Sequence, residues 1–328
     1  MVRYTLQRLV AAILTFFVIM TVIFFLIRAL PNNLIESLIN FGGSASGGGA
    51  VTQHTIDIIM ARFRWDQPLP VQYFHMITNY LRLDFGISLI LRPNMAVYEV
   101  MMQHLPVTIQ LNFFTLFLIF PLGLFVGITT ALRKNTAYDH TVSSLSILFI
   151  SAPSFVVAAL LQYFIAFKLG WFPIILAPEP QLNWTRFHSM ILPIIALSFF
   201  PIANIGRLLR AELSEALTSD FMLLARAKGQ TYGQAITRHA LRVSCVPLVG
   251  TFLYQFIFML YGSLVIEQIF SIPGISLILV RSINSHDYQL TLAIMYFYVV
   301  IGLLASILAD ISLGFIDPRI RMGGRKDE

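Results

Sequence analysis

The residue types that perform covalent catalysis or bind metals occur in this chain, but their spacing suits neither task. The seven histidines are scattered, with no H-E-x-x-H motif and no pair four residues apart. The single cysteine, Cys245, rules out a disulfide within the chain and a Cys-rich metal site. The sequence also lacks a G-x-x-x-x-G-K-[ST] phosphate-binding loop and a G-x-S-x-G nucleophile elbow. We therefore expect no catalytic residue and no metal or other cofactor bound by this chain.

Neutral polar side chains are a second set of candidates, because they lie inside long apolar stretches. Such side chains either line a path for a polar solute or hydrogen-bond neighbouring helices, and hydrogen bonding between helices is the simpler interpretation of each one. Carriers driven by protons or ions place ionisable groups within their spans, and the apolar stretches here contain almost none. The sequence thus indicates a transport path, but no group within the chain that could drive transport. The candidate path-lining residues are Gln110, Asn112, Ser151, Gln162, Asn204 and Gln255.

A third set of candidates is the basic segment at residues 225–241, which reads ARAKGQTYGQAITRHAL and lies between two apolar stretches. Its first residues predict a helix of small side chains that ends at Gly229, because glycine is the usual residue after a helix C-terminus. Such a helix can approach a partner closely, and Arg226 and Lys228 are the side chains that we expect to make its charged contacts. An ordinary basic loop on the inner side of a membrane is the alternative.

The composition requires that the elements carrying these residues are embedded in lipid. Of the 328 residues, 57% are hydrophobic and 12% are charged, which is about half the charged share of soluble proteins. Six stretches without Asp, Glu, Lys or Arg approach or exceed the roughly 20 residues that a helix needs to cross a bilayer. They are residues 9–27, 105–132, 141–167, 187–206, 243–266 and 288–309. We therefore predict an all-α membrane protein with six transmembrane helices.

The distribution of basic residues predicts the orientation of these helices. If the N-terminus is cytoplasmic, 14 of the 22 Lys and Arg residues fall on the inside, as the positive-inside rule requires. The two short outer loops then hold only Lys168, Arg186 and Arg281. We expect both termini in the cytoplasm and a multi-pass protein of the bacterial inner membrane. The net charge of +6 is then a property of membrane orientation and does not indicate binding to nucleic acid.

One sizeable segment outside the membrane lies between the first and second apolar stretches. It contains a Gly-rich tract at residues 42–49 that we expect to be poorly ordered. Val71, Phe74, Ile77 and Leu81 then recur at helical spacing, which predicts an amphipathic helix on the outer face. The predicted division is residues 1–29 for the N-terminus and first helix, 30–104 for the outer segment, 105–316 for the helical core with an inner loop at 207–242, and 317–328 for a cytoplasmic tail.

The basic segment resembles the EAA loop of ABC importer permeases, in the form found in the dipeptide, oligopeptide and nickel permease family. In that family the loop reads close to A-R-A-K-G, then nine variable residues, then an ending similar to H-A-L-R. Here residues 225–229, 230–238 and 239–242 follow the same order and spacing. Leu223 stands where the wider superfamily has Glu, a departure that the peptide branch shares. Further stretches similar to the family are residues 66–73, 83–88, 105–108, 267–274, 287–288 and 317–321.

The resemblance implies a type I permease subunit of an ATP-driven, binding-protein-dependent importer of di- or oligopeptides. It implies a second homologous permease subunit that completes the pathway, two ATP-binding subunits that carry ATP and Mg²⁺, and an extracytoplasmic solute-binding protein. Residues 219–241 would dock into one ATP-binding subunit. The residues implied in that coupling contact are Ala225, Arg226, Ala227, Lys228, Gly229, His239 and Leu241.

Three alternatives stay open at this point. The same architecture could import nickel or another small solute. An ATP-independent carrier is a second alternative, and it would require buried charges along the path. An intramembrane enzyme is a third alternative, and it would require a pair of nucleophile and base that the sequence does not offer.

Overall fold

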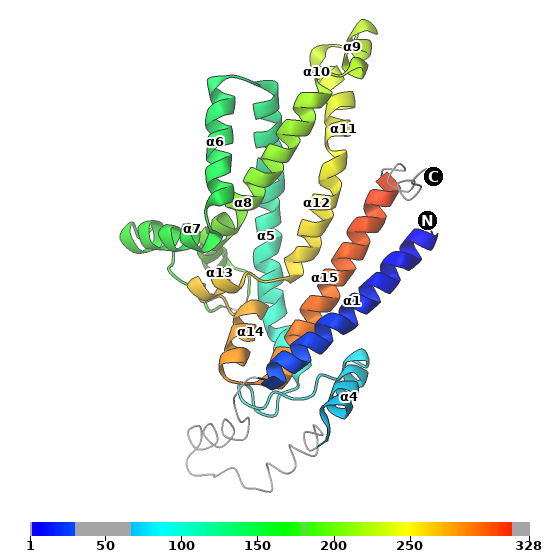
Figure 1. The fold of residues 1–328 in the computed structure, drawn as a ribbon. Coiled ribbons are helices and arrows are strands. Elements are labelled where there is room, and N and C mark those ends of the chain that lie inside the picture. Colours follow the sequence, from blue (N-terminus) through cyan, green and yellow to red (C-terminus); the bar gives the residue numbers. More distant parts are fainter. Residues whose placement is uncertain (1, 30–66, 180, 317–328) are drawn as a thin grey trace. The chain divides into compact units, whose positions relative to one another are not determined.

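The computed structural model describes residues 2–29, 67–179 and 181–316, and most of these residues are helical (Figure 1). The described ranges contain no β-strand, only an isolated bridge between Ile87 and Ala96. The prediction of an all-α protein is therefore confirmed for this part of the chain. The predicted Gly-rich tract at residues 42–49 and the predicted tail at residues 317–328 lie outside the described residues.

Within the described ranges, five helices are long and apolar enough to cross a membrane. In lipid a chain must satisfy its backbone N–H and C=O groups internally, and a helix does so within one segment. Each of the five coincides with one of the stretches that lack charged residues. They are α1 (Val2–Ala29), α5 (Val97–Leu132), α8 (Trp184–Ala216), the stretch Val246–Ile269 that begins with α12 (Val246–Ile257), and α15 (Tyr288–Ile316).

The third predicted span forms two helices with a sharp bend between them. α6 (Ala137–Ser151) and α7 (Ser154–Leu161), which continues as a π-helical turn (Gln162–Lys168), meet at an angle of 100°. Pro153 lacks a backbone donor and keeps the residue before it out of the helical conformation, and Ala152 accordingly has ψ 124°. This stretch completes the predicted count of six spans only if the bent pair is one broken span.

The chain divides into two compact units. Of the described residues, the larger unit comprises 2–5, 108–179, 181–272 and 305–316, and the smaller unit comprises 6–29, 67–107 and 273–304. In the larger unit, α6, α7 and α12 all pack against α8. α8 is therefore its central helix. The division into segments that follows chain order, predicted from the sequence, stays a prediction.

A buried carboxylate organises the loop between α4 (Leu69–Leu81) and α5 in the smaller unit. Asp287, directly before α15, accepts hydrogen bonds from the Ser88 hydroxyl and from the backbone N–H groups of Ile90 and Leu91. Burying a carboxylate is costly unless donors replace its water shell, and this loop supplies three of them. The contact attaches the loop to the start of α15. α14 (Ile275–Asn284) ends shortly before Asp287 and so leads directly to this contact.

α4 lies where the amphipathic helix is predicted, and Ile77 is the one residue of the predicted apolar face that is buried. Val71, Phe74 and Leu81 are exposed, whereas Gln72 and Tyr80 are buried within the smaller unit. Sequence periodicity identifies an apolar face but not the surface against which it packs. The exposed apolar face suits a helix that lies on a membrane surface.

α5 and α8 approach each other closely at small residues. A Cβ atom added to Gly127 would lie 2.7 Å from Leu209 Cβ and 2.9 Å from the Gly206 carbonyl oxygen. A Cβ atom added to Gly206 would lie 2.7 Å from Val126 Cγ1, and Gly123, one turn before Gly127, is similarly close to α8. Two glycines four residues apart are typical of close helix pairs in membranes, where contact between backbones replaces the hydrophobic effect.

We predict that Gly127→Ala destabilises the protein, because the added methyl group overlaps Leu209 and the α8 backbone. Overpacking of this kind costs about 1–3 kcal/mol, so the thermal unfolding midpoint of the purified protein in detergent should fall by several degrees. Gly233→Ala is the matched control, since no atom lies within 4 Å of a Cβ at that position. Equal midpoints for the two variants would contradict the close contact.

Candidate functional site

The basic segment singled out in the sequence is almost entirely helical. Residues 217–241, here called the tip segment, contain α9 (Asp220–Ala227), α10 (Tyr232–Ala235) and a π-helical turn (Ile236–Ala240) that leads into α11 (Leu241–Ser244). Figure 1 shows α9 and α10 at the end of α8, where the chain turns back into α11. Residues 207–216, predicted as part of the loop, continue α8 as helix. The tip segment is therefore a folded extension of the central helix.

The C-terminus of α9 has the backbone geometry that its glycine predicts. Gly229 has φ +84°, a left-handed conformation that glycine adopts without strain. The N–H of Gly229 donates to the Arg226 carbonyl at 3.0 Å, and the N–H of Gln230 donates to the Ala225 carbonyl at 3.3 Å. This pair of hydrogen bonds is the Schellman motif, which satisfies the last carbonyl groups of a helix. The sequence prediction of a helix that ends at Gly229 is confirmed.

The next helix begins with a capping box. The Thr231 hydroxyl accepts from the Gln234 N–H, and the Gln234 side chain accepts from the Thr231 N–H at 3.1 Å. The T-x-x-Q spacing carried this signal in the sequence, but our reasoning from the sequence did not use it. His239 Nε2 lies 3.1 Å from Gln230 Oε1 and links the π-helical turn to the end of α9. These contacts hold the tip segment in one conformation without a partner.

One face of the tip segment is packed against its own chain. Met222 and Ala225 on α9, and Ala240 on the π-helical turn, belong to one apolar core with Leu213 and Ala216 of α8. Ala225 is only 5% exposed, so its small side chain lets α9 lie close to this core. That placement differs from the expectation that Ala225 allows close approach of a partner. Leu241 is half-buried and packs against the same core, and His239 is also half-buried.

The opposite face carries cations and unpacked apolar side chains. Arg226, Ala227, Lys228 and Gly229 are exposed, as a docking contact requires. Leu223 is 65% exposed, and it belongs to a patch that the sequence reasoning missed. Apolar residues within a polar loop are the signal that could have revealed it. The exposed apolar side chains of the patch are Phe221, Leu223, Leu224 and Tyr232, and the Arg226 guanidinium lies 5.7 Å from the Tyr232 ring centroid.

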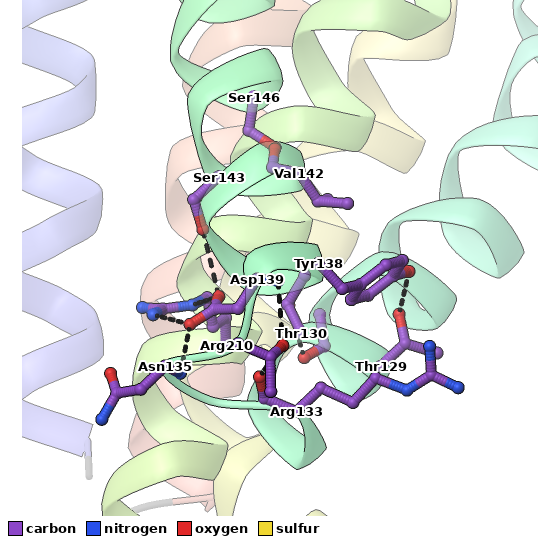
Figure 2. Close-up of polar contacts among 12 residues, drawn as sticks. Thr129, Thr130, Arg133, Asn135, Tyr138, Asp139, Val142, Ser143, Ser146 and Arg210 are labelled. Atoms are coloured by element: carbon purple, nitrogen blue, oxygen red, sulfur yellow. Dashed lines mark hydrogen bonds and ion pairs between the residues drawn. The ribbon is translucent and has the colours of Figure 1, made fainter.

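An ion pair between a buried carboxylate and a partly exposed guanidinium connects α6 to α8 shortly before the tip segment (Figure 2). Arg210 Nε and Nη2 donate to the two carboxylate oxygens of Asp139 at 2.5 and 2.6 Å. The Asp139 side chain is fully buried, and the Asn135 N–H and the Ser143 hydroxyl also donate to it. The pair therefore fixes the last turns of α8 against the α5–α6 hairpin. The two residues are 71 positions apart in the sequence, and no local sequence pattern predicts such a pairing.

A second carboxylate is buried where the sequence predicted the outer end of a span. Glu267 of α13 (Leu264–Ile269) is fully buried, and its Oε1 accepts a hydrogen bond from the Thr108 hydroxyl at 2.8 Å. Glu267 and Asp139 each lie in an end turn of a helix, as the sequence indicates for Glu267, but both carboxylates are buried there. Both groups receive hydrogen bonds within the larger unit, which offsets the cost of their burial.

Three of the six candidate path-lining residues make hydrogen bonds within the chain. Gln110 accepts from Arg186 Nε at 3.2 Å. Asn112 donates to the carbonyl groups of Met259 and Tyr261 at 3.0 and 2.7 Å, where the stretch that begins with α12 leaves regular α-helix. Gln162 donates to the carbonyl groups of Ile174 and Ile269 at 2.9 and 2.8 Å. These contacts support the simpler interpretation, in which neutral polar side chains tie chain segments together.

The other three candidates lie at separate places in the larger unit. Gln255 lines a cavity of about 250 Å³ together with Asn112. Ser151 lines a different cavity of about 340 Å³ beside Pro153. Asn204 is exposed on α8. The structure thus brings Asn112 and Gln255 to one cavity, and the contact of any of the six with a transported solute stays a prediction.

Two family descriptions match the sequence, and a solved structure is similar in fold. "Binding-protein-dependent transport system inner membrane component" matches residues 120–322, and the description of the corresponding N-terminal region matches residues 1–112. A chain of the MetNI methionine ABC transporter, solved in inward facing conformations, is similar with a TM-score of 0.54 and 17% identity. The match covers 67% of this chain and 97% of that chain. At this level of identity, the similarity concerns the fold alone.

Curated relatives match almost the whole chain. The dipeptide transport system permease protein DppB of Lactococcus lactis subsp. cremoris is 36% identical over 98% of this chain and 100% of its own length. DppB of Bacillus subtilis is 33% identical over 98% of this chain and 99% of its own. The oligopeptide transport system permease protein OppB of Escherichia coli K12 is 32% identical over 98% of this chain and 100% of its own.

We predict that the Asp139–Arg210 pair is energetically coupled. Arg210→Gln leaves a buried carboxylate without its counter-ion and should destabilise the protein by about 3 kcal/mol. This value is at the lower end of the range measured for breaking buried ion pairs, because Arg210 is partly exposed. Adding Asp139→Asn removes the stranded charge and should recover part of this loss. A double-mutant cycle of thermal unfolding in detergent measures the coupling.

Arg207→Gln is the matched control for this cycle, because Arg207 is an exposed cation on the same helix. Its unfolding midpoint should stay close to that of the wild type. Strictly additive effects of Asp139→Asn and Arg210→Gln would show that the pair contributes nothing as a pair.

Proposed function

Because the chain belongs to the family of binding-protein-dependent transport system inner membrane components, we propose that it is one permease subunit of an ATP-driven importer of dipeptides or oligopeptides. The choice of peptides is supported by relatives that are named for dipeptide or oligopeptide transport and match over nearly their full length. The long apolar helices and the family make the protein a multi-pass protein of the inner membrane.

In the proposed topology both termini are cytoplasmic and the bent pair α6–α7 is the third of six spans. The excess of basic residues in the segments assigned to the cytoplasm supports this orientation. Counting spans from a cytoplasmic N-terminus then puts the tip segment, between the fourth and fifth spans, in the cytoplasm.

The tip segment is the proposed contact with an ATP-binding subunit. The observation that carries this proposal is the exposed patch of Phe221, Leu223, Leu224 and Tyr232 beside Arg226 and Lys228. Apolar side chains exposed on a folded, water-facing segment are costly unless a partner covers them. Large apolar and aromatic side chains at the centre of a contact supply most of its binding energy, and cations at its rim set its orientation.

The proposed assembly contains this chain, a second homologous permease, two ATP-binding subunits and an extracytoplasmic solute-binding protein. ATP and Mg²⁺ would bind to the ATP-binding subunits, and this chain would supply half of the pathway. Closure of the ATP-binding pair would move the two tip segments together. Because the tip segment shares one apolar core with α8, its movement would carry α8 with it and turn the pathway outward.

We predict that Gly229→Asp uncouples transport. The substitution places a negative charge beside Arg226 and Lys228 at an exposed position where no atom lies within 4 Å of a Cβ. The left-handed backbone at φ +84° costs a residue other than glycine about 1–2 kcal/mol, and Asp is one of the residues that tolerate it, so the fold should persist. ATP-dependent uptake of a radiolabelled dipeptide into vesicles should fall to a small fraction of the wild-type rate while the amount of protein in the membrane stays the same.

Gly170→Asp is the matched control, since Gly170 also has a positive φ, +65°, and open space around it. It should leave uptake unchanged. Normal uptake by Gly229→Asp would contradict the docking role, and uptake by the purified chain without ATP-binding subunits would refute the proposed function as a whole.

We predict that Leu223→Ser weakens the association with the ATP-binding subunit. Leu223 is largely exposed and outside the apolar core, so its loss should cost the fold little but should remove an apolar contact from the interface. Truncating a central contact of this kind costs about 1–2 kcal/mol, or roughly a tenfold increase in the dissociation constant. Leu182→Ser is the control, because Leu182 is exposed in a loop assigned to the other side of the membrane. Equal retention of the ATP-binding subunit by both variants during purification would argue against the patch.

A further inference from the structure

A polar cavity in the smaller unit is unrelated to the contacts described so far. It has a volume of about 310 Å³ and is lined by α1, α4, the turn after α4 and the first turns of α15. Most of its lining groups can hydrogen-bond or carry charge, among them Arg28, His75, Asn79, Tyr80, Asp84 and Gln289. Pockets that bind small molecules have volumes of about 300–1,000 Å³, so this cavity suits a small solute.

The hydroxyl group of Tyr80 has no hydrogen-bond partner among the described residues of the chain, although the side chain is only 2% exposed. A buried hydroxyl without a partner reduces stability, and such groups are rare in folded proteins. Burial also raises the pKa of Tyr80 above its usual value, so the hydroxyl keeps its proton and can donate. Phenylalanine would fill the same space without this cost, so the hydroxyl calls for a partner beyond the described residues, and a bound solute would supply one.

The cavity combines this donor with charges of both signs. The guanidinium of Arg28 comes from the end of α1, where it lies 5.7 Å from the centroid of the Phe24 ring. The carboxylate of Asp84 comes from the turn after α4, where it also accepts a hydrogen bond from the Gly86 N–H. A cation and an anion from different elements, with a buried donor between apolar groups, match a molecule that carries its own anion and cation.

We propose that this cavity is a binding site for a small zwitterion of amino-acid or dipeptide size. Arg28 binds the carboxylate of the solute, Tyr80 donates to a carboxylate or carbonyl oxygen, and Asp84 accepts from the ammonium group. In the proposed topology the end of α1 and the start of α15 face the outside, so the site takes solute from that side. The use of a dipeptide as the probe and the side from which solute enters rest on the proposed function; the chemistry of the site does not.

The test is calorimetric titration of the purified permease and ATP-binding complex with alanyl-alanine, without the solute-binding protein. The complex is held in bilayer discs of phosphatidylglycerol, so that no zwitterionic lipid competes for the site. Alanyl-alanine should bind, and its N-acetylated and C-amidated forms, which each lack one charge, should bind roughly tenfold more weakly or worse. Equal binding of all three forms, or no binding of the free dipeptide at millimolar concentration, would overturn the proposal.

The variant Tyr80→Phe tests whether the dipeptide binds in this cavity. Its affinity for alanyl-alanine should fall about 3- to 10-fold, the value of one hydrogen bond. Tyr73→Phe is the matched control on the same helix, because the Tyr73 hydroxyl accepts from Thr21 and does not line the cavity. Equal affinity of Tyr80→Phe and wild type would show that the dipeptide binds elsewhere, and the proposal would fail.

A second measurement on Tyr80→Phe separates binding from a structural role. Without solute, the variant should unfold at the same temperature as the wild type or higher, because it removes a hydroxyl that has no partner. With solute, the wild type should gain stability and the variant should gain less. A variant that unfolds earlier without solute would show that the hydroxyl is a structural group, against the proposal. ATP-dependent uptake with the solute-binding protein restored tests the proposed function separately, and it can succeed when this site fails.

Discussion

The close contact between α5 and α8 is the interaction on which the larger unit depends. Moving an apolar side chain from lipid into a contact between helices lowers the free energy little, because lipid is equally apolar. Two helices in a membrane therefore associate through close packing and through hydrogen bonds. Gly127 and Gly206 supply that closeness, since a Cβ atom at either position would overlap the facing helix. Because α6, α7 and α12 pack on α8 in turn, the position of α8 determines where they lie. A change in the separation of α5 and α8 would therefore displace most of the unit.

The same contact continues into the tip segment as one apolar core. Ile119 of α5, Leu209 and Leu213 of α8, and Met222 of α9 belong to a single cluster of buried residues. The Asp139–Arg210 pair adds a polar attachment at the level where α8 leaves the α5–α6 hairpin. Packed cores transmit displacement because they resist compression. A force on the exposed face of α9 would thus move α8 rather than bend the connection between them.

Local patterns in the sequence predicted the elements, whereas long-range pairing and the direction of packing could not be read from it. Five of the six stretches without charge correspond to long helices, because a bilayer imposes length and composition on any spanning segment. Gly229 predicted the end of α9 because its role depends on adjacent backbone alone. Pro153 is a local signal for the bend, but the prediction of one span at residues 141–167 did not use it. Asp139 and Arg210 are 71 residues apart, and Ala225 packs inward through contacts with α8; neither fact follows from a neighbouring residue.

The fixed conformation of the tip segment has a consequence for the energy of coupling. The Schellman motif at Gly229 and the capping box at Thr231 hold α9 and α10 in place in the isolated chain. A partner that binds a preformed helix loses little to ordering it, so more of the contact energy is kept as affinity. A disordered loop would absorb part of each displacement as a change in its own conformation. A rigid tip on a rigid core passes that displacement on to α8, which is the property that a subunit without its own source of energy requires.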